Sequence, residues 1–211
     1  MRTPSLLVIG GTGFIGHHLL KSAEQKGWHI TSVSLNPPTN NRLVKGVRYL
    51  HFDISNPDLL KNNLCENFNY VVNLGGYINH QLFKDGGREL IEVHFNGLQN
   101  LIEVLPRNEL KRFVQIGSSD EYGNSVAPQN EKMPGSVISP YSFGKKAVAD
   151  LLKMLYQTEK FPMVVIRLFL VYGPGQNSDR FFPQIINGCL SGNSFPVSKG
   201  EQLRDFCYID D

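Results

Sequence analysis

The sequence predicts an α/β fold, a doubly wound parallel sheet of the Rossmann type, on three observations. Short β-rich runs alternate with helical patterns, which is typical of a parallel sheet with helices on both faces. A glycine-rich turn joins the first apolar run, residues 6–9, to a helical pattern. The 211 residues are enough for one large domain of this class and too few for a second full one.

Strands and helices are expected to alternate through the first part of the chain. The strands are predicted at residues 5–9, 29–34, 46–52, 69–74, 112–117 and 162–168, and the helices near 14–26, 56–65, 86–105 and 139–158. Pro140 opens the last helix, and an apolar stripe follows at helical spacing: Ala147, Leu151, Leu152 and Leu155. After Tyr172 the pattern loosens into Gly, Pro and Asn, so we assign 1–172 to the sheet domain and 173–211 to a small, incomplete substrate-binding part.

Composition indicates a soluble cytoplasmic protein. Hydrophobic residues make up 41% and charged residues 19% of the chain, as in ordinary globular proteins. The net charge of +2 comes from scattered basic residues, which argues against nucleic-acid binding. No apolar run approaches ~18 residues, so no membrane span is expected. Cys65, Cys189 and Cys207 lack CxxC spacing, so we expect reduced thiols and no metal site.

The glycine-rich turn contains Gly10, Gly13 and Gly16, with Phe14 and Ile15 between the last two. A dinucleotide pyrophosphate needs a sharp turn, close approach of backbone N–H groups and a helix N-terminus facing its charge. Glycines at this spacing satisfy those needs. They also occur in many α/β domains simply for packing, so the turn alone leaves both interpretations open.

Tyr141 and Lys145 lie four residues apart, on one face of the predicted helix. A free phenol has a pKa of about 10, and a cation beside it favours the phenolate. A serine hydroxyl in the segment 117–123, at the end of the fifth strand, would lie near a bound ligand, because ligands in such sheets bind at the carboxyl ends of strands. This set suits proton exchange with a substrate oxygen while a nicotinamide exchanges hydride. The alternative is a helix-face aromatic beside a solvated lysine.

The ordered motifs together resemble the extended short-chain dehydrogenase/reductase family, in its NAD-dependent epimerase/dehydratase group acting on nucleotide sugars. The resemblance covers essentially the whole chain and rests on the glycine turn, Asp53, the serine after the fifth strand, the YxxxK pair and two segments, Arg167-Leu168-Phe169 and Arg204-Asp205-Phe206.

The resemblance implies roles for individual residues. Catalysis would fall to Ser118, Tyr141 and Lys145, with Ser118 rather than Ser119 in the family's hydroxyl position. Substrate contacts would come from Ser119 and Arg204, the latter gripping a diphosphate. Cofactor contacts would come from Gly10, Gly13, Phe14, Ile15, Gly16, Ser34, Arg42, Asp53, Ile54, Leu74, Gly75, Gly76, Tyr141 and Lys145.

The end of the second strand favours NADP as the cofactor, with NAD as the alternative. Members that use NAD carry an acidic residue there, which bonds the ribose 2′-OH. Here the position is Ser34, and no acidic residue occurs between Glu24 and Asp53. Three bases follow instead, which either favour a 2′-phosphate or are simply solvated: Arg42, Lys45 and Arg48.

Three departures from the family pattern bear on the reaction. Ser119 and Asp120 stand where dehydratases place Asp and Glu, so a dehydratase is disfavoured, and we interpret Asp120 and Glu121 as loop charges. Leu170 replaces an asparagine expected to contact substrate. His94 replaces a helix asparagine, and we interpret it as a polar residue filling a helix contact.

The leading functional prediction is NADPH-dependent reduction of a 4-keto-6-deoxy nucleotide sugar. The alternatives are an NAD-dependent nucleotide-sugar 4-epimerase and a non-catalytic dinucleotide-binding module. A homodimer is expected through the helices at 86–105 and 139–158. The family continues beyond Asp211, so we expect either a fragment or a shortened protein with an open substrate site.

Overall fold

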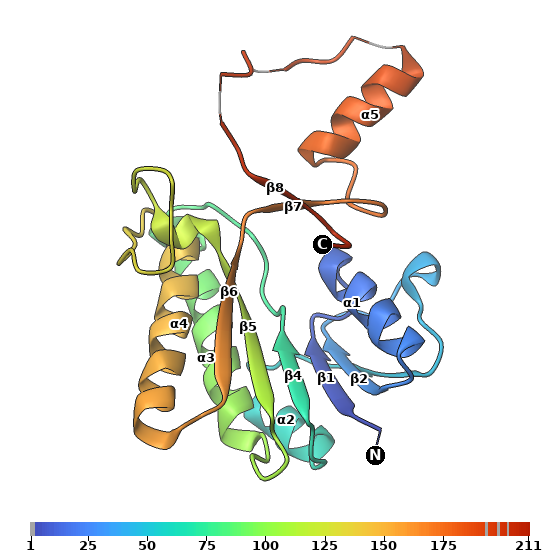
Figure 1. Ribbon diagram of the computed structural model, residues 1–211, viewed down its shortest axis with the longest axis vertical. Helices are drawn as coiled ribbons and strands as arrows, with labels where there is room; N and C mark the ends of the chain where they lie inside the picture. The colour runs from blue at the N-terminus through green and yellow to red at the C-terminus, as the bar shows by residue number, and fades with distance from the viewer. Residues whose placement is uncertain (1–2, 193, 198, 202) are drawn as a thin grey trace. The chain divides into compact units, whose positions relative to one another are not determined.

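The structure is a computed structural model that describes residues 3–192, 194–197, 199–201 and 203–211. It divides into two compact units, the first ending at Leu168 and the second running from Phe169 to Asp211. The first unit contains, in order, β1 (Ser5–Ile9), α1 (Phe14–Gln25), β2 (His29–Ser34), β3 (Val47–His51), α2 (Pro57–Asn63), β4 (Tyr70–Asn73), α3 (Gly87–Val104), β5 (Arg112–Ser118), the 3₁₀ helix η3 (Ser119–Tyr122), α4 (Pro140–Glu159) and β6 (Met163–Leu168) (Figure 1).

The six strands form one parallel sheet in the order β3-β2-β1-β4-β5-β6, which confirms the predicted fold. Every predicted strand and helix is present, with its ends within two residues of the prediction. Ile9 at the end of β1 pairs with Val33 of β2 on one side and with Asn73 of β4 on the other. The chain reverses its direction of winding between β1 and β4, and ligands bind at such a point.

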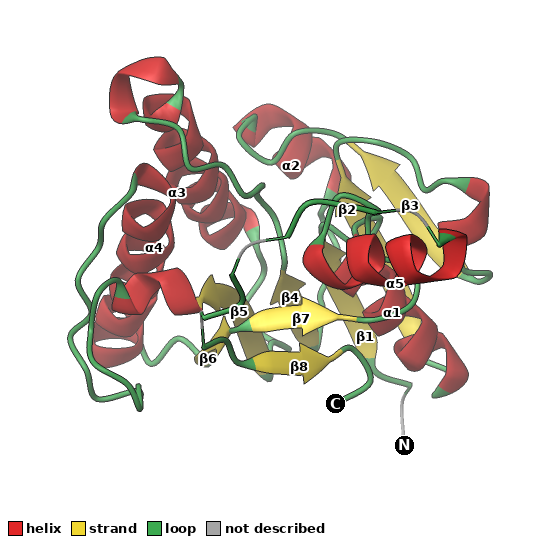
Figure 2. Ribbon diagram, turned by 90° about the horizontal axis from the view of Figure 1, so that it is seen from above, coloured by secondary structure: helices red, strands yellow, loops and turns green. Residues whose placement is uncertain are grey.

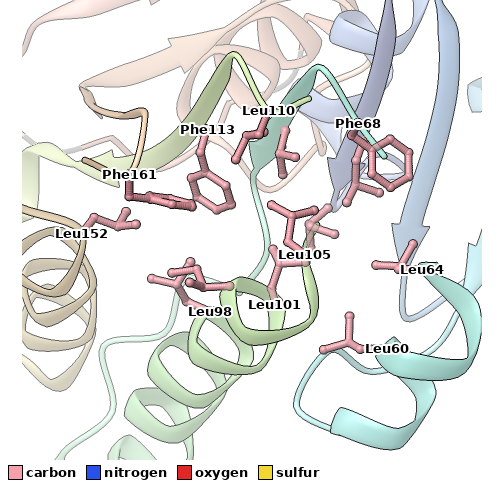
Figure 3. Close-up of a cluster of buried hydrophobic side chains, with 14 of the residues drawn as sticks. Leu60, Leu64, Phe68, Leu98, Leu101, Leu105, Leu110, Phe113, Leu152 and Phe161 are labelled. Atoms are coloured by element: carbon pink, nitrogen blue, oxygen red, sulfur yellow. The ribbon is translucent and has the colours of Figure 1, made fainter. Parts of the chain in front are cut away.

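Alternating side chains of β1 serve two separate cores. Leu7 and Ile9 face a large cluster with residues of α2, α3 and α4, whereas Leu6 and Val8 face a smaller one with residues of α1. The helices accordingly cover opposite faces of the sheet (Figure 2). Figure 3 shows the large cluster, in which Phe113 of β5 lies 5.4 Å, centroid to centroid, from Phe161. This cluster packs α2, α3 and α4 against one face of the sheet.

The second unit contains β7 (Leu170–Tyr172), α5 (Phe181–Ser191) and β8 (Phe206–Tyr208), with β7 and β8 parallel. Its aromatic side chains pack together: the ring of Tyr172 stacks on Phe182 at 4.3 Å, and Phe206 meets Phe182 at 4.7 Å. The sequence predicts none of these elements, and it places the boundary after Tyr172 instead of after Leu168. Substrate binding by this unit stays a prediction.

Candidate active site

The turn from β1 to α1 is shaped as a dinucleotide pyrophosphate requires. Gly10 has φ +80°, and a Cβ on Gly16 would lie 2.3 Å from the Gly10 carbonyl oxygen, so both positions require glycine. Gly13 is the N-cap of α1, and among the described residues no side chain caps this helix and no acid lies in its first turn. The first N–H groups of α1 therefore fit a phosphate.

Polar groups meet beside this turn at the end of β2. The Ser34 hydroxyl accepts the Thr12 N–H at 3.3 Å, and Arg42 donates from Nη1 to the Thr12 carbonyl at 3.3 Å. Arg42 thus holds its guanidinium against the glycine turn. Arg48, one of the three bases noted in the sequence, instead pairs with Glu66 at 2.8 Å.

The remaining predicted cofactor residues follow β3 and β4. Asp53 accepts the Ser55 N–H at 2.8 Å, which shapes the turn after β3. Ile54 approaches α3 so closely that a Cβ on Gly97 would lie 3.0 Å from it. After β4, the Leu74 N–H donates to the Ile9 carbonyl at 2.9 Å, so the segment 74–76 begins beside the glycine turn.

Tyr141 and Lys145 are both buried, which contradicts the alternative of a solvated lysine beside a surface aromatic. Ser139 caps α4, so Tyr141 lies in the first turn of the helix. Lys145 donates from Nζ to the Ile116 carbonyl at 3.1 Å and lies 5.9 Å from the Tyr141 ring centroid. Burial lowers the pKa of Lys145 to about 8, while the charge of Glu121 opposes that shift.

Two histidine rings pack edge-on against Tyr141. His94 of α3 and His80 each lie 5.7 Å from it, centroid to centroid. His94 is buried, and its Nε2 lies 3.3 Å from the Tyr77 carbonyl oxygen. Burial, and then the charge of Lys145, lower the pKa of His94 to about 4. His94 does fill a helix contact, as expected, but the contact is with the proposed catalytic tyrosine.

The interpretation of Asp120 and Glu121 as loop charges is wrong for Glu121. Its side chain is fully buried, with Oε1 accepting the Ser118 N–H at 2.9 Å and Oε2 accepting from Arg167 Nε at 2.9 Å. Asp120, in contrast, is partly exposed, with Oδ2 4.0 Å from His80 Nδ1. The spacing Ser118-x-x-Glu121 is a capping-box signature that could have revealed Glu121 from the sequence.

Arg167 completes this buried group at the end of β6. Its guanidinium lies 4.7 Å from the centroid of the Tyr122 ring. Burial lowers the pKa of Arg167, but hydrogen bonds to Tyr122 and Glu121, together with the Glu121 charge, outweigh that effect and raise it. The family-type segment that begins at Arg167 therefore supports the end of β5.

The two predicted substrate residues lie in different units. Ser119 opens η3 and is half-buried beside Ser118. Arg204 lies in the second unit, is exposed, and donates to the Leu203 carbonyl at 3.3 Å. Among the described residues, no group of His, Cys, Asp or Glu could hold a metal ion, and no helix is long and apolar enough to cross a membrane.

Residues 6–211 match the NAD dependent epimerase/dehydratase family. The chain belongs to this family. A curated relative is the dTDP-D-glucose 4,6-dehydratase of Dictyostelium discoideum, 24% identical over 98% of this chain. The crystal structure of UDP-glucose 4-epimerase from Thermotoga maritima shares the fold, with a TM-score of 0.88 at 22% identity over 98% of this chain and 70% of that one.

A UDP-glucuronic acid 4-epimerase from Bacillus cereus, solved in complex with UDP-glucuronic acid and NAD, is 25% identical with a TM-score of 0.81. This likeness covers 98% of the present chain and 69% of the epimerase. The chain spans 53% of the length of the Dictyostelium relative. The relatives include nucleotide-sugar epimerases, dehydratases and decarboxylases.

Proposed function

We propose that this chain carries the dinucleotide-binding and proton-transfer parts of an NAD(P)-dependent oxidoreductase acting on a nucleotide sugar. The buried Tyr141–Lys145 pair is the observation that carries the proposal. When bound, a nicotinamide dinucleotide supplies or accepts hydride at carbon. Tyr141 would give a proton to the substrate oxygen, Lys145 would favour the phenolate and hold ribose hydroxyls, and Ser118 would orient the oxygen.

We further propose NADPH-dependent reduction of a 4-keto-6-deoxy nucleotide sugar as the reaction. The end of β2 supports NADP as the cofactor in this proposal, because Ser34 replaces the acid typical of NAD binding. Arg42, held at the glycine turn through its contact with Thr12, offers a charge suited to a 2′-phosphate. Asp53 and Ile54 would line the adenine end, and residues 74–76 would approach the dinucleotide from β4.

A second candidate is an NAD-dependent 4-epimerase, which the Bacillus cereus epimerase with bound NAD favours. The two reactions differ in stoichiometry. A reductase consumes one NADPH for each substrate, whereas an epimerase returns its hydride and consumes none. A non-catalytic module would bind dinucleotide without turnover, so binding and turnover are measured on one preparation.

The deciding experiment is the substitution Tyr141→Phe. This change keeps the ring but removes the transferable proton, so turnover of a panel of nucleotide 4-keto-sugars should fall by at least ~100-fold. Dinucleotide binding, measured by calorimetry, should persist. Near-normal turnover in Tyr141→Phe would contradict the proposal.

The serine assignment has its own matched pair of variants. Ser118→Ala should reduce turnover more than Ser119→Ala, because the Ser118 hydroxyl is proposed to hold the substrate oxygen. The reverse ranking would move this role to Ser119.

A further inference from the structure

A buried carboxylate lies directly behind the proposed catalytic residues. Glu121 has no exposed surface, although it sits only three residues beyond Ser118. Oε1 accepts the Ser118 N–H at 2.9 Å, which holds the main chain of Ser118 in place at the end of β5. Oε2 accepts from Arg167 Nε at 2.9 Å, so the carboxylate bridges β5 and β6.

The neighbouring backbone leaves room for this carboxylate. A Cβ on Gly117 would lie 2.3 Å from Glu121 Oε1, well inside any normal contact distance. Gly117 therefore has no side chain at the point where the carboxylate reaches back to Ser118. Its φ is not in the left-handed region, so the requirement for glycine here is one of space.

The charge of Glu121 also acts on Lys145. Lys145 Nζ is bonded to the carbonyl of Ile116, next to Gly117 in β5, and Glu121 is the group whose charge favours the ammonium form. The other groups around Lys145 are Tyr141 on its own helix and His94 on α3, and His94 is held neutral by burial. On its far side, Glu121 pairs with Arg167, whose guanidinium lies over the ring of Tyr122.

We propose that Glu121 is the positioning residue of this site: it anchors the Ser118 main chain and supplies a buried negative charge at the end of β5, the strand to which Lys145 is also bonded. It contacts neither substrate nor cofactor in this role. The proposal rests on the proposed functions of Ser118 and Lys145. Its tests, however, read the charge of Lys145 and the anchoring of Ser118 without any turnover.

The charge is tested by Glu121→Gln, which keeps the shape and an acceptor for Ser118 but removes the negative charge. Carbon-13 NMR of labelled lysine, with Lys145 assigned through Lys145→Met, follows the titration of Lys145. The wild-type midpoint should lie at about 8. In Glu121→Gln it should fall by about one pH unit or more.

Asp150→Asn is the matched control, since Asp150 is an exposed carboxylate on the same helix that pairs with Lys146. It should leave the Lys145 midpoint unchanged. An unchanged midpoint in Glu121→Gln would overturn the proposal. If that variant fails to fold because Arg167 is left unpaired, the double variant Glu121→Gln/Arg167→Met removes both charges and should show a smaller fall, because the positive charge of Arg167 is lost as well. A midpoint that does not fall in the double variant would overturn the proposal.

The anchoring is tested by Gly117→Ala, which displaces the carboxylate without changing any charge. Amide hydrogen exchange at Ser118 should become at least about tenfold faster, because a charge-assisted hydrogen bond is lost. Exchange at Phe113, early in β5, serves as the internal control. Unchanged exchange at Ser118 would overturn this part. If Tyr141→Phe retained turnover while Lys145 titrated as expected, the proposed function would fail and the role of Glu121 would stand.

Discussion

The buried side chain of His94 makes the stability of the folded chain depend on pH. Its ring is buried against Tyr141, and its pKa lies at about 4 in the folded protein. In the unfolded chain the ordinary value is 6.5. Between these values the unfolded chain binds a proton that the folded protein does not, so stability falls as pH falls through this window.

We therefore expect acid to destabilise the protein through His94. The full effect, reached below about pH 4, amounts to roughly 3 kcal/mol. Urea unfolding at about pH 7 and about pH 4.5 should show a smaller stability loss in His94→Asn than in the wild type. His29→Asn, at an exposed histidine, is the control and should keep the wild-type loss. An equal loss in His94→Asn would contradict this assignment.

At the level of single residues, the burial of Tyr141 and Lys145 agrees with the motif that singled them out, whereas their neighbours were harder to predict. The glycine turn, Tyr141 and Lys145 were visible because each motif has a fixed spacing that a strand or helix translates into geometry. The capping-box spacing marks Glu121 in the sequence, but the burial of Glu121 does not follow from that spacing, because it depends on Arg167, 46 residues away, and on the space left by Gly117. His80 was not singled out, since its contact with Tyr141 comes from a loop that has no sequence periodicity.

Among the elements, the end of β2 is expected to determine whether the site prefers NADP or NAD. Ser34 is buried, and its hydroxyl is fixed by the Thr12 N–H. A carboxylate placed there would bond a ribose hydroxyl but repel a 2′-phosphate.

Ser34→Asp should therefore shift the preference from NADP towards NAD in calorimetric titrations with both dinucleotides. The wild type should bind NADP more tightly. Asn67→Asp, which adds the same charge in the loop before β4, should leave the preference unchanged. Tighter binding of NAD than of NADP by the wild type would overturn the cofactor proposal.

Elements of the second unit could not be predicted from pattern. Helix α5 begins Phe181-Phe182-Pro183, and neither β7 nor β8 exceeds three residues, too few to display a period. These short elements are instead held together by ring contacts among Tyr172, Phe182 and Phe206, which form only once distant segments of the chain meet. The first unit was predictable because its strands and helices are long enough to show periodicity.

For the molecule as a whole, a second copy is expected on α3 and α4. Phe143 and Met154 are exposed, at 49% and 44%, and eleven residues apart they share one face of α4. Exposed apolar side chains on a long helix suit a two-fold interface with another copy of the chain.

Light scattering across micromolar concentrations should therefore give the mass of a dimer. Met154→Glu should shift the distribution towards monomer, because it would bury a charge in the interface. Leu59→Glu, which adds the same charge at an exposed residue of α2, should not. A monomeric wild type at every concentration would argue against the interface.

The place of β1 between β2 and β4 also governs when the chain can fold during its synthesis. β1 can pair with β2 once residue 34 has emerged from the ribosome. Its other edge cannot be fully paired until Asn73 of β4 has been synthesised. At cellular rates of elongation that wait lasts roughly 2 to 8 s. Throughout it, the open edge of β1 and the apolar side chains of Leu7 and Ile9 lack the partners that later cover them. While that edge is unpaired it can pair with other segments of chain, which is the usual route to mispairing in sheets.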